Sequence, residues 1–128
     1  MKPKIENTIA TAILDQAFKV HRALGPGLLE SVYEKCLQYE LIKAGFKTLS
    51  QVAVPVNYKT IHQEVAYRID LLVENKVLVE VKAVEKLAPV CFAQTLTYCK
   101  MKDLRLGLLI NFNTTYLKDG IHRIANNL

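Results

Sequence analysis

The chain has 128 residues, of which 51% are hydrophobic and 23% are charged, with five glycines and four prolines. This length fits a single domain over residues 1–128, and the composition excludes disordered, collagen-like and low-complexity proteins. The net charge of +5 favours a polyanionic partner such as nucleic acid, although many proteins of this size carry such a surplus only for solubility.

Two helices are predicted at the start of the chain. Apolar residues recur at three- and four-residue steps from Ile5 to Leu24, which is the spacing of an amphipathic helix. Gly25 and Pro26 end this helix, and a second helix is expected over residues 28–44. Its expected buried residues are Val32, Cys36, Leu37 and Leu41.

The middle of the chain is predicted to form strands. Segments rich in Val, Ile and Tyr cover residues 46–58, 64–74 and 76–84. The second and third of these segments flank a short polar turn around Asn75. These two strands should therefore pair as an antiparallel hairpin.

The remainder of the chain predicts a third helix, a strand and a short closing element. Pro89 suits the first turn of a helix over residues 89–102, and the apolar run 104–112 is typical of a buried strand. A turn at residues 118–120 leads to a strand or helix over residues 121–125. The predicted order is thus two helices, three strands, a helix, a strand and the closing element.

The sequence shows no signal for a membrane or for export. No apolar run approaches the roughly 18 residues that a membrane helix needs, and no secretory leader is evident. We therefore expect a cytoplasmic protein that does not bind membranes. Cys36, Cys91 and Cys99 form an odd set without metal-ligand spacing, which suits a reducing compartment and packing as small hydrophobic side chains.

The predicted hairpin brings three ionisable side chains to one face. Asp70 and Glu80 are equidistant from Asn75, so they should lie opposite each other, and Lys82 shares their face because side chains alternate along a strand. Two facing carboxylates on buried strands repel each other, which a divalent cation compensates. Without His or Cys ligands, Mg²⁺ is favoured over zinc. A salt bridge from Lys82 to one carboxylate, at a solvated end of the sheet, fits the spacing equally well.

Two helices add polar residues to this pattern. Glu30 lies in the first turn of the second helix, where the helix dipole alone favours an acidic residue. Gln94 and Tyr98 are four residues apart on the third helix and therefore share one side of it. Taken alone, they are also typical of a polar helix face with an aromatic residue at its rim.

The three histidines suggest a competing type of site, in which a cysteine acts as nucleophile. His21, His62 and His122 lie on three different predicted elements, and no Cys-containing catalytic signature accompanies them. We therefore do not expect nucleophilic catalysis.

Together these residues resemble a known family. The motifs that carry the resemblance are Gly27-x-x-Glu30-x-x-Tyr33, Tyr67-Arg68-Ile69-Asp70, Val79-Glu80-Val81-Lys82 and Gln94-x-x-x-Tyr98. In order and spacing they look like the GxxExxY family, which is placed in the PD-(D/E)XK nuclease superfamily, and the resemblance covers residues 9–124. It implies an α/β fold, with a restriction-endonuclease-like αβββαβ core, an extra N-terminal helix and a mixed central sheet.

The resemblance also implies a site for metal-dependent hydrolysis of phosphodiester bonds. The implied metal ligands are the side chains of Asp70, Glu80 and Glu30 and the backbone carbonyl of Val81. The implied catalytic residues are Glu30, Asp70, Glu80 and the motif lysine Lys82. Gln94, Tyr98 and Arg68 are expected to bind the substrate. Ile69 replaces the proline in the name of the superfamily, at a position that often varies.

The expected function is that of a DNA nuclease that uses Mg²⁺, with Mn²⁺ as a substitute. Lys82 is expected to orient water as a cation rather than act as a base, because neighbouring carboxylates favour its charged form. The alternative is an inactive nucleic-acid-binding or protein-binding domain, which the intact acidic and lysine positions disfavour. A glycosidase also fits the paired acids but leaves Lys82 without a role. Because one site cuts one strand at a time, a homodimer is expected for cutting a duplex.

Overall fold

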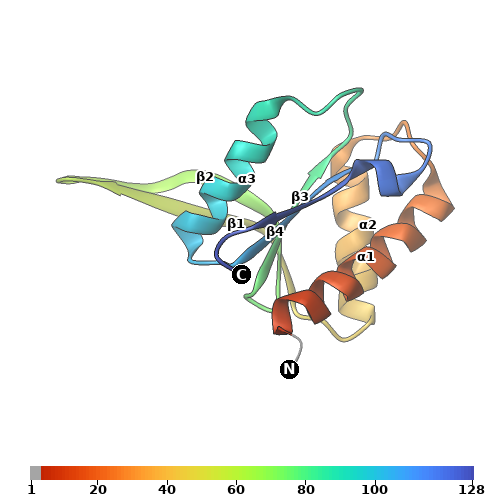
Figure 1. Ribbon diagram of the computed structural model, residues 1–128, viewed down its shortest axis with the longest axis horizontal. Helices are drawn as coiled ribbons and strands as arrows, with labels where there is room; N and C mark the ends of the chain where they lie inside the picture. Colours follow the sequence, from red (N-terminus) through yellow and green to blue (C-terminus); the bar gives the residue numbers. More distant parts are fainter. Residues whose placement is uncertain (1–3) are drawn as a thin grey trace.

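The computed structural model describes residues 4–128, which form three α-helices and five strands (Figure 1). The helices are α1 (Ile5–Leu24), α2 (Glu30–Lys43) and α3 (Pro89–Lys102). The strands are β1 (Thr48–Tyr58), β2 (Ile61–Val73), β3 (Val77–Lys82), β4 (Leu106–Asn111) and β5 (Ile121–Ala125), and the short 3-10 helix η1 (Leu117–Gly120) precedes β5. The predicted order of elements is confirmed, and the closing element is a strand.

The strands form one sheet in the order β1-β2-β3-β4-β5. β3 and β4 are parallel, whereas the other neighbouring strands are antiparallel, so the predicted mixed sheet is confirmed. The hairpin register joins Val73 to Val77 and Leu71 to Val79, which centres the turn on Asn75 as expected. Asn75 has a positive φ of 53°, a conformation that asparagine tolerates better than most residues.

Helices cover both faces of the sheet. α1 and α2 pack on one face, and α3 lies across the other (Figure 1). Alternate residues of β3 therefore enter different cores: Val79 packs with the α1 and α2 side, and Leu78 packs with Cys99 of α3. Because both faces are covered, β3 and β4 are almost entirely buried, which explains their nearly continuous apolar sequences.

The structure corrects one predicted core residue of α2. Val32 was expected to be buried but is 36% exposed, and the neighbouring Tyr33 fills the core. Its ring stacks on Phe112 with 4.7 Å between centroids, and its hydroxyl donates a hydrogen bond to the carbonyl of Gly25 at 2.6 Å. These contacts fix the rotation of α2, so that Tyr33, Leu37 and Leu41 face the sheet at four-residue steps.

Two further sequence expectations concern membranes and thiols. Over the described residues, no helix combines the length and the apolar character that crossing a bilayer requires. Cys36, Cys91 and Cys99 are free thiols. Cys99 is buried beneath α3 and Cys36 packs against the core of α1 and α2, so both act as small hydrophobic side chains.

Gly120 provides a test of the packing at the end of β4. A Cβ atom at Gly120 would lie 2.1 Å from the carbonyl oxygen of Asn111, so Gly120→Ala must push two backbone segments apart. We expect a loss of unfolding free energy of about 2 kcal/mol or more, measured by urea denaturation. Asp119→Ala, at an exposed neighbouring position, is the control and should leave stability nearly unchanged. Equal stabilities of the two variants would contradict this packing.

Candidate active site

The hairpin of β2 and β3 places Asp70 beside Glu80. They are the residues directly next to Leu71 and Val79, the last pair of the β2–β3 ladder. Asp70 Oδ2 accepts a hydrogen bond from the backbone N–H of Val81 at 2.9 Å, which fixes the carboxylate of β2 against β3. The structure therefore brings together the two acids that the sequence placed opposite each other.

Glu80 is the most unusual acid of this pair. It is only 6% exposed, and among the described residues its Oε1 has no hydrogen-bond partner. Burial, followed by the negative charge of Asp70, raises the pKa of Glu80 to about 9. A buried carboxylate without such partners needs either a proton or a cation to compensate its charge.

Two tyrosines lie on the α3 side of Glu80. The rings of Tyr67 and Tyr98 stack. Tyr67 is half-buried, and its hydroxyl group is a second buried polar atom that has no partner among the described residues. Burial and the charge of Glu80 raise the pKa of both hydroxyl groups, so both are neutral donors near pH 7. Gln94, one turn before Tyr98, is exposed on the same helix.

Glu30 joins the site from the first turn of α2. Its Oε1 accepts a hydrogen bond from the backbone N–H of Ala83 at 3.2 Å, just after the end of β3. This contact ties the helix to the strand that carries Glu80 and Lys82. Glu30 is exposed, so it lies at the rim of the site rather than inside the core.

The predicted basic residues lie nearby but do not neutralise the acids. Lys82 is half-buried, and within residues 4–128 it forms no ion pair with Asp70 or Glu80. The simple salt bridge that the sequence allowed is therefore not formed. Arg68 is exposed, and its guanidinium donates a long hydrogen bond of 3.5 Å to the carbonyl of Gln51.

Two residues of this site, Glu34 and Gln51, were missed by the sequence predictions. The amide nitrogen of Gln51 donates hydrogen bonds to Glu34 Oε1 at 2.9 Å and to Asp70 Oδ1 at 3.3 Å. Gln51 has a φ of 53° within β1, and the β1–β2 register passes from Ser50 to Val52 without it. A left-handed backbone of this kind costs a residue other than glycine about 1–2 kcal/mol of conformational energy. Gln51 adopts it at the position where its side chain bridges two acids.

Glu34 extends the acidic cluster along α2. It lies one helical turn after Glu30, and this spacing was a signal in the sequence. Burial raises its pKa, as do the charges of Asp70 and Glu30, whereas the hydrogen bond from Gln51 lowers it. Glu30, Glu34, Gln51 and Asp70 line one groove of about 760 Å³. The groove gives a ligand access to Asp70 from solvent.

The acidic side chains of the site are candidate ligands for a divalent metal ion. In the part of the chain that is described, no three His, Cys, Asp or Glu side chains are arranged around one metal position, so Glu30 does not converge with Asp70 and Glu80. Mg²⁺ does not require such a cage, because it usually keeps several waters and uses one or two carboxylates. The adjacent acids Asp70 and Glu80, with the unpartnered Glu80 Oε1, fit a hard cation of this kind.

The comparison with protein families agrees with this architecture. The family model of the PD-(D/E)XK nuclease superfamily matches residues 7–124. The chain therefore belongs to the PD-(D/E)XK nuclease superfamily, as predicted, and this membership supports a nuclease-type function. No curated protein and no solved structure matches the chain significantly. The narrower assignment to the GxxExxY family stays a prediction.

Proposed function

We propose that this protein is a nuclease that hydrolyses phosphodiester bonds in DNA with Mg²⁺ as its cofactor and Mn²⁺ as a substitute. The observation that carries the proposal is the buried Glu80 carboxyl group, which lies beside Asp70 and has an oxygen without a partner among the described residues. Two adjacent acids, one of which (Asp70) lines the groove, favour a cation, and the net charge of +5 favours a nucleic acid substrate.

In this proposal each acid has a distinct position relative to the cation. Asp70, Glu80 and the backbone carbonyl of Val81 would hold the ion, and the hydrogen bond from the Val81 N–H keeps Asp70 oriented. A bound Mg²⁺ would supply charge neutralisation at the scissile phosphate and a water of lowered pKa. Glu30, held by Ala83 at the rim, would accept a hydrogen bond from a water that enters through the groove.

The remaining predicted residues are assigned to the substrate. Lys82 follows Glu80 by two residues on β3 and has no carboxylate partner in residues 4–128, so its ammonium group is available to a phosphate oxygen. Arg68 offers an exposed cation to the backbone of the nucleic acid. Tyr98 and Gln94 are proposed to contact the substrate from α3, where both share one side of the helix.

A nicking assay tests the proposal. Supercoiled plasmid, single-stranded DNA and single-stranded RNA are each incubated with the protein in Mg²⁺, in Mn²⁺ and in EDTA. We expect cleavage of DNA in either metal and none in EDTA. Activity that persists in EDTA would reject metal dependence, and cleavage of RNA alone would reject DNA as the substrate.

Gln51 provides a separate prediction about the support of the site. Gln51→Gly and Gln51→Ala both remove the amide that bridges Glu34 and Asp70, so both should lower the cleavage rate, about tenfold or more. The glycine variant should be more stable than the alanine variant, by about 1 kcal/mol, because only glycine adopts this positive φ without strain.

Cleavage rates and urea denaturation of the two variants separate these effects. Gln63→Ala, which removes an exposed glutamine from β2, is the matched control and should retain wild-type activity. Equal stability of the glycine and alanine variants would contradict backbone strain at Gln51, and full activity of both would show that the amide is not needed.

A further inference from the structure

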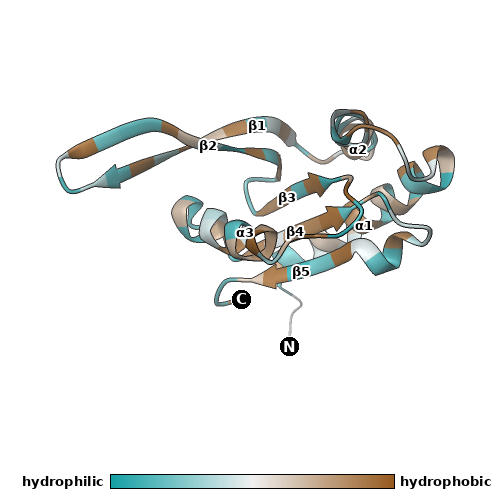
Figure 2. Cartoon of the chain, turned by 90° about the horizontal axis from the view of Figure 1, so that it is seen from above, coloured by the Kyte–Doolittle hydropathy of each residue, from teal (hydrophilic) through white to brown (hydrophobic). Residues whose placement is uncertain are grey.

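β1 and β2 extend well beyond the other strands as a two-stranded ribbon (Figures 1 and 2). We call residues 55–66 of this ribbon the β-arm. Its pairs Val56 with Gln63 and Tyr58 with Ile61 keep the two strands in register up to the turn. No residue of the β-arm is buried, and within residues 4–128 it extends past the ends of the other strands. An isolated two-stranded hairpin is at best marginally stable in water, so the β-arm lacks the packing that usually supports such a ribbon.

One face of the β-arm presents large apolar side chains to solvent. Tyr58 and Ile61 are cross-strand partners at the tip, and each is 61% exposed. Val56 belongs to the same face by alternation and is half-buried. Gln63, the exposed cross-strand partner of Val56, also lies on this face. Among the described residues Tyr58 and Ile61 stay outside the cores, so they form an exposed apolar patch at the tip.

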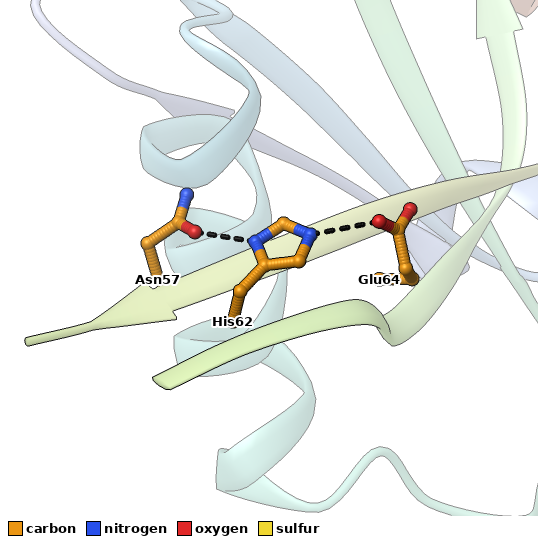
Figure 3. Close-up of polar contacts among 3 residues, drawn as sticks. All are labelled: Asn57, His62 and Glu64. Atoms are coloured by element: carbon orange, nitrogen blue, oxygen red, sulfur yellow. Dashed lines mark hydrogen bonds and ion pairs between the residues drawn. The ribbon is translucent and has the colours of Figure 1, made fainter. Parts of the chain in front are cut away.

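The opposite face has polar side chains that bond to one another. Figure 3 shows the His62 ring between Asn57 and Glu64. His62 Nδ1 pairs with Asn57 Oδ1 across the two strands, and His62 Nε2 bonds to Glu64 Oε1 at 2.9 Å. These contacts give both ring nitrogens of His62 a partner within the β-arm itself. On the other face, Tyr58 and Ile61 stay largely exposed among the described residues.

Charge indicates what kind of partner fits the apolar face. The β-arm contains one lysine, Lys59, and one acid, Glu64, so it is neutral although the whole chain carries +5. The Lys59 ammonium group lies over the Tyr58 ring, 5.4 Å from its centroid. Binding to nucleic acid depends on several cations that contact phosphates, whereas the centres of protein interfaces are depleted of charge and enriched in tyrosine. The β-arm therefore fits a protein surface.

We propose that the β-arm is a self-association surface, in which the apolar faces of the arms from two copies of this chain pack across a two-fold axis. Such an interface needs no complementary surface elsewhere, because the same patch meets itself. β1 is also the edge strand of the sheet, so its outer backbone groups are open to a second strand. The neutral arm adds no like-charge repulsion between the copies. This inference does not depend on the proposed nuclease activity.

Sedimentation velocity of the full chain, without metal or nucleic acid, tests the proposal over a range of protein concentrations. The arm variant is Tyr58→Ser with Ile61→Ser. Its matched control is Tyr116→Ser with Ile42→Ser, which removes a tyrosine and an isoleucine that are 66% and 54% exposed on other parts of the chain. We expect the wild type and the control to dimerise, and the arm variant to associate at least about tenfold more weakly.

Circular dichroism shows whether each variant keeps its fold, and Ile61→Lys is a second variant that introduces repulsion across the two-fold axis without truncating the strand. A monomeric wild type at every concentration would overturn the proposal. Unchanged dimerisation of both arm variants, or equal loss in the control, would do the same. If the wild type is monomeric and the arm variant loses affinity for DNA, the partner of the β-arm is nucleic acid and self-association is wrong.

Discussion

Asp70→Asn and Glu80→Gln are each expected to reduce DNA cleavage by about 10³-fold. Both changes keep the size of the side chain but remove the negative charge that would hold a cation at the β2–β3 junction. The hydrogen bond from Val81 N–H to position 70 can still form with an amide oxygen, so the local fold should survive. The loss should therefore be a loss of activity without a loss of structure.

Lys82→Ala should lower the cleavage rate by about 10²-fold, because it removes one cation from the reacting phosphate. Lys82→Arg keeps the charge and should recover part of the activity if the residue acts as a cation. If Lys82 were instead a base, arginine would not restore activity, because its guanidinium stays protonated. Rates of plasmid nicking for the three proteins decide between these roles.

Glu85→Gln is the matched control for the acidic substitutions. Glu85 is an exposed acid that follows β3 by three residues, so its substitution has the same overall charge effect without touching the pair. This control variant should cut DNA as well as the wild type. Wild-type cleavage by the Asp70→Asn or the Glu80→Gln variant would overturn the assignment of the two acids.

Asn75 shows why so much of this site follows from local sequence. A two-stranded hairpin has one register once its turn is known, so the position of Asn75 alone placed Asp70 beside Glu80. The helices α1 and α3 were predicted with their observed ends because glycine or proline marks a boundary of each. Local chemistry is sufficient wherever the constraint lies within a few residues.

Tyr33 and Gln51 show where local sequence is insufficient. Both Val32 and Tyr33 suit an apolar helix face, and only the contact with Phe112, far along the chain, decides which one is buried. A glutamine has no preference for positive φ, so nothing near Gln51 indicates that β1 turns its amide toward Asp70. Tertiary contacts determine both features.

The β-arm was also absent from the sequence predictions. The sequence predicts that the second strand begins at residue 64, since His62 and Gln63 are typical of a polar loop. In the structure β2 begins earlier, at Ile61. Alternation of side chains cannot distinguish a strand within a sheet from one that projects beyond it. The length of β2 relative to β3 is therefore visible only in the structure.

The second large expected effect is a dependence on pH of the free energy of unfolding in the absence of metal. The pKa of Glu80 is about 9 in the folded chain, against an ordinary value of 4.5. Between these two pH values the folded state therefore keeps a proton on Glu80 that the unfolded state has lost. The contribution of this proton to the free energy of unfolding is complete below pH 4.5 and is lost as the pH rises toward 9. Each pH unit costs at most about 1.4 kcal/mol.

Glu80→Gln replaces the protonated acid by a neutral group of similar shape. At pH 8 this variant should be more stable than the wild type, by up to about 4 kcal/mol, and near pH 4.5 the two proteins should be nearly equally stable. Urea denaturation in EDTA at a series of pH values measures the difference. Parallel stability curves for the two proteins would contradict the raised pKa of Glu80.

A divalent cation should reverse the loss of stability that the wild type shows at high pH, because the cation takes the place of the proton on Glu80. The affinity for Mn²⁺ should therefore rise, by up to about tenfold per pH unit at neutral pH, with release of about one proton per ion. Calorimetry in two buffers of different ionisation enthalpy measures that proton.

In the Asp70→Asn protein the pKa of Glu80 is no longer raised by the charge of Asp70, but it is still raised by burial, which is the larger cause. The pH dependence of metal binding should therefore shift to lower pH without disappearing. Binding without proton release would mean that the cation sits elsewhere, since no ion can bind to the protonated Glu80 carboxyl group without displacing its proton.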